Sequence, residues 1–253
     1  MTRELLQEAT RRALAIADSI FPARFKAEAP HLLQVAVGML ARCVTTGEAC
    51  LHLSELDRRT DLLVAVRTLY EHTVTLGWLT GSDHGEERMM LLQRHSDEQA
   101  LRIDNEMVVA GGESFISEGT RTAMAEAAAA LGTARMPSLA DRAVQADKDW
   151  WHRLAMDSND DFPWSFRSNY TSLYRPASAM AHPTWAGVRI VIERSEAGIV
   201  IDKEATRCGA EALQPVPALL GLALLISAHA LGRPDPNGID QFVSWFAGAS
   251  KRA

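Results

Sequence analysis

The segment Tyr174–Pro183 gathers side chains that suit anion binding and acid–base chemistry. It reads YRPASAMAHP, so an arginine, a serine and a histidine stand among small residues. Arg175 and His182 are seven positions apart, which is two helical turns, so a continuous helix places both on one face. Ser178 comes four positions before His182 and shares that stripe. Pro183 disfavours helical geometry at the residue before it, so we expect the helix to end at His182.

This position gives His182 two interpretations. The last turn of a helix lies at the negative end of the helix dipole, which favours the protonated imidazole, and such a histidine can change its charge near neutral pH. That behaviour suits a general acid or base. The structural alternative is that Ser178 and His182 hydrogen-bond each other, or cap carbonyl groups, inside a helical bundle. Both interpretations remain open.

A second polar pair, Arg67 and Glu71, lies in the apolar stretch VAVRTLYEHTVTLGWL. If the pair is exposed, it is an ordinary intrahelical ion pair that contributes roughly 0.3–0.5 kcal/mol. If it is buried, both charges need further polar partners, because an unpaired buried charge is costly. The helix that carries Ser178 and His182 could supply those partners. We favour this joint polar cluster over the exposed pair.

These two segments resemble an uncharacterised bacterial helical family whose signatures are R-x-x-x-E and S-x-x-x-H-P. The first corresponds here to Arg67 and Glu71, and the second to Ser178, His182 and Pro183. The resemblance covers residues 30–80 and 165–232.

The pattern Arg175-x6-His182 also resembles the R-x4–6-H motif of the HEPN superfamily (higher eukaryotes and prokaryotes nucleotide-binding). This resemblance implies a metal-independent ribonuclease that acts on RNA, needs no cofactor, is often a homodimer and works in toxin or phage-defence settings. It also implies that His182 is the acid or base at the ribose 2′-hydroxyl or the leaving oxygen, and that Arg175 holds the scissile phosphate. The supporting residues are then Ser178, Arg67, Glu71 and Tyr174. The alternative is a non-catalytic helical module that binds a partner protein or a nucleotide-like ligand.

The composition of the chain argues against several classes of protein. The 253 residues carry a formal net charge of −6, which argues against a protein that coats nucleic acid, although a local basic patch remains compatible with it. The three cysteines are an odd number without a C-x-x-C pair, which indicates reduced thiols and a cytoplasmic protein. The single E-x-x-H spacing, Glu28 to His31, does not make a di-iron site, which needs two such motifs and further carboxylates. We therefore expect no metal.

The hydrophobic periodicity predicts an all-α protein, mainly a helical bundle, with one small β-hairpin near residues 188–202. One domain over residues 1–253 is the favoured organisation, and residues 111–160 form the candidate for a softer lobe. The apolar stretch Val216–Leu231 is interrupted by Ser227 and His229 and is too short to span a membrane, so we expect a buried core helix and no membrane partner.

Local signals also predict the ends of two helices. A helix that starts near Pro30 is expected to run to about Gly47, with a separate segment after it. The helix that carries Arg67 is expected to be capped by Asp57 or Thr60 and to end at Gly81.

Overall fold

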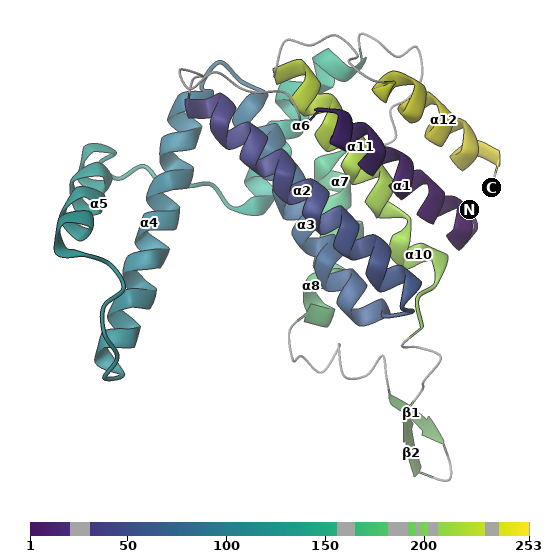
Figure 1. Cartoon of the computed structure of the whole chain (residues 1–253), viewed down its shortest axis with the longest axis horizontal. Coiled ribbons are helices and arrows are strands. Elements are labelled where there is room, and N and C mark those ends of the chain that lie inside the picture. Colours follow the sequence, from purple (N-terminus) through teal and green to yellow (C-terminus); the bar gives the residue numbers. More distant parts are fainter. Residues whose placement is uncertain are drawn as a thin grey trace.

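The computed structural model describes residues 1–20, 31–155, 165–181, 192–195, 198–201, 207–230 and 238–252, and most of them are helical (Figure 1). The helices of the N-terminal half are α1 (Arg3–Ile20), α2 (His31–Glu55), α3 (Arg59–Thr80), α4 (Gly85–Val109), α5 (Glu118–Ala130) and α6 (Leu139–Ala155). Those that follow are α7 (Phe166–Asn169), the π-helical segment η1 (Tyr170–Tyr174), α8 (Arg175–Ala181), α10 (Ala210–Leu213), α11 (Pro215–Ala230) and α12 (Ile239–Arg252). The all-α class expected from the sequence is confirmed.

Two short strands lie in the region where the sequence predicts a hairpin. Strands β1 (Ile192–Ser195) and β2 (Gly198–Ile201) pair antiparallel, with Ile192 opposite Ile201. In the described part of the chain the sheet has these two strands alone, and Figure 1 draws it apart from the helices. The strands therefore add no sheet layer to the fold.

Helix α3 runs through the middle of the bundle, where α2, α6, α8 and α11 pack against it. Every residue from Thr73 to Leu79 is buried, so this half of the helix has no solvent face. A helix that is covered on all sides belongs inside a core. The hydroxyl groups of Thr73 and Thr75 donate hydrogen bonds to carbonyl oxygens four residues earlier, at 2.9 and 2.7 Å, which offsets the cost of burying them.

Polar side chains fix α6 against α3. The Trp78 Nε1 group donates a hydrogen bond to Gln145 Oε1 at 2.8 Å. The Arg142 guanidinium donates a hydrogen bond to Thr75 Oγ1 at 2.6 Å. Because side-chain hydrogen bonds need a specific geometry, these contacts set the position of α6 along α3 as well as its distance from it.

Gly47 does not end α2 as the sequence predicts, since the helix continues to Glu55. A Cβ atom at Gly47 would lie 2.8 Å from the Cδ atoms of Leu220 on α11. The glycine therefore marks a close approach of two helices and not a helix end. A glycine inside a helix costs about 1 kcal/mol relative to alanine, and here packing against Leu220 offsets that cost.

Helix α11 is buried in the core, as expected for residues 216–231. Among the described residues, one helical stretch, Ala210–Ala230, is long and apolar enough to cross a membrane. However, 78% of its most apolar window is buried inside the structure, where the helix packs against α1, α2, α3 and α12. Its apolar character is explained by this burial.

The expected cap of α3 is wrong. The residue at the N-cap position is Arg58, which makes no capping hydrogen bond through its side chain. Asp57 has a left-handed backbone (φ 61°), and its Oδ1 atom accepts hydrogen bonds from the Arg3 guanidinium at 3.1 Å and from the Cys208 N–H at 2.8 Å. This carboxylate therefore joins the start of the chain to residues near α10 and does not cap α3.

Helix α3 ends at Thr80, directly before Gly81, as predicted, but the reason is different. Gly81 has an ordinary right-handed backbone (φ −77°), so no left-handed cap requires a glycine here. A Cβ atom at this position would lie 2.6 Å from Nε1 of the buried Trp150. The glycine makes room for this indole, which donates a hydrogen bond to Gly77 O at 2.8 Å.

Helices α4 and α5 form an arm that extends to one side of the bundle (Figure 1). The buried carboxylate of Asp104 on α4 holds the arm together. Its oxygens accept hydrogen bonds from Ser114 Oγ, from the N–H groups of Phe115 and Ile116, and from the Arg121 guanidinium on α5. Burial pushes the pKa of Asp104 up, but these donors outweigh burial and hold the pKa below its usual range.

We predict that Asp104→Asn loosens α5 and the loop before it without unfolding the bundle. The asparagine loses the charge that Arg121 pairs with and one of the acceptor oxygens. Hydrogen exchange should show faster exchange over residues 110–130 and unchanged exchange in α3. Asp97→Asn, on the same helix but outside this contact, is the matched control.

The same carboxylate gives the arm a pH dependence. Because the folded-state pKa is lowered, the stabilisation is present above the usual pKa of an aspartate, about 3.9, and is lost as the pH falls through the folded-state value. The protection of residues 110–130, expressed relative to the intrinsic exchange rate at each pH, should therefore fall at acidic pH in the wild type. If Asp104→Asn changed neither this profile nor the exchange at neutral pH, the carboxylate would not hold the arm together.

Candidate functional site

Arg67, Glu71 and Tyr174 form a hydrogen-bonded group between α3 and η1. The Arg67 Nε–H donates to Glu71 Oε1 at 3.2 Å, and the Tyr174 hydroxyl donates to the same oxygen at 2.9 Å. The side chains of Arg67 and Glu71 are 23% and 35% exposed, so the pair lies at the edge of the core. Arg67 and Glu71 thus have a further polar partner, but it is Tyr174 of η1, whereas the sequence pointed to the helix that carries Ser178 and His182.

Aromatic rings surround this group. Tyr174 stacks on Tyr170, with ring centroids 5.2 Å apart, and lies tilted against Tyr70 at 5.6 Å. The Arg67 guanidinium lies over the Tyr174 ring, 5.4 Å from its centroid, which is within cation–π range. Burial and the hydrogen bond to Glu71 raise the pKa of Tyr174, so its hydroxyl stays protonated and remains a donor well above neutral pH.

A capping interaction on α6 places the start of the segment that carries Tyr174. The Asp147 carboxylate accepts hydrogen bonds from the N–H groups of Phe166 and Arg167, at 2.7 and 2.9 Å, and from Ser165 Oγ at 2.7 Å. A carboxylate at the first turn of a helix satisfies its free N–H groups. The Tyr70 hydroxyl then donates to Phe166 O, which ties α7 to α3 from the other side.

The helix widens between α7 and α8. Residues Tyr170–Tyr174 are π-helical, and the Arg175 N–H bonds to Tyr170 O, five residues earlier. Single π turns are rare, cost stability and occur often at functional sites. Here the π turn coincides with the contact between Tyr174 and Glu71, directly before Arg175. Sequence reasoning did not find it, because no residue in YTSLY demands this conformation.

Arg142 is a further cation at this group that sequence reasoning missed. It lies on α6 and is half-buried, and its Nη1 group binds Thr75. Burial lowers the pKa of Arg142, while Glu71, Tyr174 and Tyr70 act in the opposite direction, so the guanidinium lies within electrostatic range of all three. Its Nε–H is buried and has no hydrogen-bond partner among the described residues.

His72 also lies within electrostatic range of Glu71. Burial and the nearby Arg42 lower the pKa of His72, and Glu71 partly opposes them, so the imidazole is neutral at physiological pH. Its Nδ1 atom is buried and has no hydrogen-bond partner among the described residues. The sequence signal is the run Glu71-His72, but three other histidines lie in α2 and α4, and nothing in the sequence favours this one over them.

The residues predicted to do chemistry are only partly described. Arg175, the first residue of α8, is exposed, while Ser178 on the same helix is half-buried. Small Ala177 between them is buried and lets α8 pack closely against α3. His182 lies outside the described residues, so its distance from Arg175 stays a prediction.

The described part of the chain contains no evident metal centre. There, no group of three or more His, Cys, Asp and Glu side chains could hold a metal ion. The three cysteines are buried free thiols, and burial raises the pKa of Cys43 and Cys50 to about 12, so neither is a thiolate ligand as it stands.

The fold and this site define an all-α bundle whose central helix carries a polar cluster of arginine, glutamate and tyrosine at its edge. Residues 33–199 match a family of unknown function, DUF5677. The match covers more than half of the chain and includes α2 to α8, so the protein belongs to this family. No curated protein and no solved structure matches the chain.

We predict that Glu71 and Tyr174 act on stability as one unit. Glu71→Gln and Tyr174→Phe should each lower the free energy of unfolding by about 1 kcal/mol, a value that allows for the partial exposure of Glu71. The double variant should lose clearly less than the sum, because Tyr174→Phe removes the hydrogen bond and Glu71→Gln removes the charge that strengthens the same bond. Urea denaturation of the four proteins measures this coupling, and strict additivity would show that the bond contributes nothing.

Proposed function

We propose that this protein is a metal-independent ribonuclease of the HEPN type, a cytoplasmic homodimer that acts on RNA in toxin or phage defence. Its site would be the face formed by α3, η1 and α8. The observation that carries the proposal is the contact of Tyr174 with Glu71, which ties the segment directly before Arg175 to the helix bearing Arg67.

The charges of this face support an anionic substrate. Although the whole chain carries a formal net charge of −6, Arg67 and Arg142 both lie within electrostatic range of Glu71 and Tyr174, and the exposed Arg175 follows Tyr174 directly in the chain. A local excess of positive charge attracts a phosphodiester even on an acidic protein. Arginine suits this role because its planar guanidinium can bind two phosphate oxygens at once.

In the proposed reaction the ribose 2′-oxygen loses its proton and bonds to the adjacent phosphorus. The bond from phosphorus to the 5′-oxygen breaks, and that oxygen takes up a proton, which leaves a 2′,3′-cyclic phosphate and a 5′-hydroxyl. His182 would accept the first proton or deliver the second. Arg175 would bind the phosphate and stabilise its growing charge. Arg67, Glu71, Tyr174 and Ser178 would hold α8 in place and not touch the reacting atoms.

A second candidate function is a non-catalytic module that binds a nucleotide-like ligand or a partner protein. It is favoured by the bonding of Glu71, whose Oε1 atom already accepts hydrogen bonds from Arg67 and Tyr174 and is therefore engaged in structure. The exposed cation Arg175 and the half-buried ring of Tyr170 would then hold a phosphate and stack a base without cleavage.

RNA cleavage in EDTA tests the proposal. We expect the purified wild type to cleave an RNA panel without metal and to leave 2′,3′-cyclic phosphate ends. His182→Ala should lose about 10²–10⁴-fold in rate, because it lacks the proton-transfer group. Arg175→Ala should lose about 10²–10³-fold, because it lacks the charge that stabilises the transition state.

His95→Ala, an exposed histidine on α4, is the matched control and should keep full activity. Binding of uncleavable 2′-deoxy-substituted RNA, followed by fluorescence anisotropy, separates the two candidates. If His182→Ala no longer cleaves RNA but still binds it, the result supports the nuclease. A folded wild type that binds RNA or nucleotides but leaves the whole panel intact would favour the binding module instead.

A further inference from the structure

Exposed apolar side chains concentrate on the arm. In the part of the chain that the structure describes, they include one set of large residues close together near the end of α4 and in the loop after it: Ile103, Met107, Val108, Val109 and Phe115. Val109 has the highest exposure of the set, at 89%. Clusters of this kind on a soluble surface usually mark a contact with another molecule.

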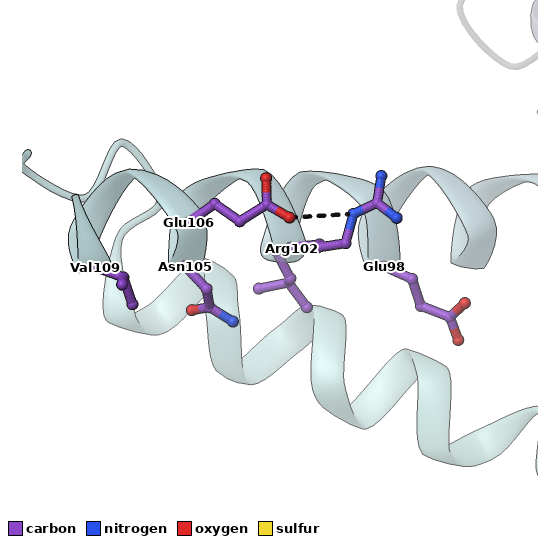
Figure 2. A pocket seen from close by; sticks show the side chains of 6 residues that line it. Glu98, Arg102, Asn105, Glu106 and Val109 are labelled. Carbon is purple, nitrogen blue, oxygen red and sulfur yellow. Dashed lines mark ion pairs between the residues drawn. The ribbon is translucent and has the colours of Figure 1, made fainter.

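One face of α4 is hollowed into a shallow groove beside these residues. It is lined by Glu98, Leu101, Arg102, Asn105, Glu106 and Val109 (Figure 2). We call these six residues the α4 face. Leu101 and Val109 are its apolar members, while Arg102 and Glu106 form an ion pair at 3.8 Å in which both side chains are about 70% exposed.

We propose that the α4 face binds the same face of a second copy of this chain, with the two helices antiparallel around a two-fold axis near Asn105. A two-fold contact uses one patch on both subunits, so the patch must be complementary to itself. The order of residues along α4 meets this requirement in both its apolar and its charged members.

The apolar members match first. Leu101 and Val109 each lie four residues from Asn105, on opposite sides of it. In an antiparallel pair centred there, Val109 reaches the level of Leu101 of the partner subunit, and the reverse contact follows by symmetry. Val109, the most exposed aliphatic residue of the arm, is thereby covered by an apolar side chain in both subunits.

The charges match in the same register. Arg102 lies three residues before the axis and Glu106 one residue after it, so Arg102 and Glu106 of the partner subunit differ in level by about 3 Å. That offset is within reach of two long side chains, and the pairing also occurs twice. Asn105 meets its own copy at the axis, where a polar residue fixes register in helix pairs, while its Oδ1 atom accepts a hydrogen bond from Arg121 at 2.9 Å.

The contact lies on the arm, away from α8 (Figure 1), and does not depend on the proposed ribonuclease activity. Sedimentation equilibrium over a wide concentration range tests it on the full chain. We expect a reversible dimer in the wild type. Val109→Lys should weaken it by about tenfold or more, because a charge replaces the apolar contact at two places.

Ile103→Lys is the matched control on the same helix. Ile103 is exposed as well, at 48%, but it points about a third of a turn away from Val109 around the helix. It should leave the dimer unchanged. Both variants should keep the helical circular dichroism of the wild type, since neither side chain is part of the core.

A charge swap tests the register. Arg102→Glu and Glu106→Arg should each weaken the dimer by about tenfold, because each places like charges opposite one another twice. The double variant restores both the ion pair within the helix and the two pairs between subunits, so it should recover wild-type association. Recovery distinguishes a direct contact from a general loss of helix stability.

Three results would overturn the proposal. The first is a wild type that stays monomeric at every concentration. The second is a dimer that Val109→Lys leaves intact, which would place the contact elsewhere. The third is a dimer that Ile103→Lys disrupts while Val109→Lys does not, which would assign it to the neighbouring face of α4.

Discussion

Helix α3 is buried on every side along its last two turns and on one side only before them, and the rest of the structure depends on how this is achieved. From Thr73 to Leu79 it is covered on every side, so four other helices must pack around it. Glu71 lies two residues before this stretch and Arg67 six residues before it, where the helix reaches the edge of the core. Two charged side chains at the edge of the core need water or hydrogen-bond partners. The chain supplies one such partner from η1, the hydroxyl of Tyr174, which donates to Glu71.

The position of that partner follows from contacts that begin on α6. Asp147 caps α7, Tyr70 binds a carbonyl of the same short helix, and the π turn after it directs Tyr174 to Glu71. Each step fixes the next with a directional hydrogen bond. The exposed Arg175 thus emerges from a segment that is held at both ends, which is a suitable base for a residue that binds a substrate.

The arm follows a different principle. It has few buried apolar residues of its own, and a single buried carboxylate, Asp104, organises the loop and helix that lie against α4. A unit of this kind can present a surface without disturbing the core, because it shares little packing with the core. The bundle and the arm therefore divide the molecule into a part that carries the candidate site and a part suited to association.

The sequence by itself determined the helical class, the buried character of α11 and the pairing of Arg67 with Glu71, because hydrophobic periodicity and four-residue spacing are local properties. The tertiary structure decided what lies far apart in the chain. The sequence predicts a helix end at Gly47, where the structure has a close approach of Leu220, and it predicts a cap at Asp57, whose carboxylate instead joins Arg3 to Cys208. Tyr174, Arg142 and His72 gather near Glu71 for the same reason: side chains on different helices meet only after packing, and no local pattern records which of them will do so.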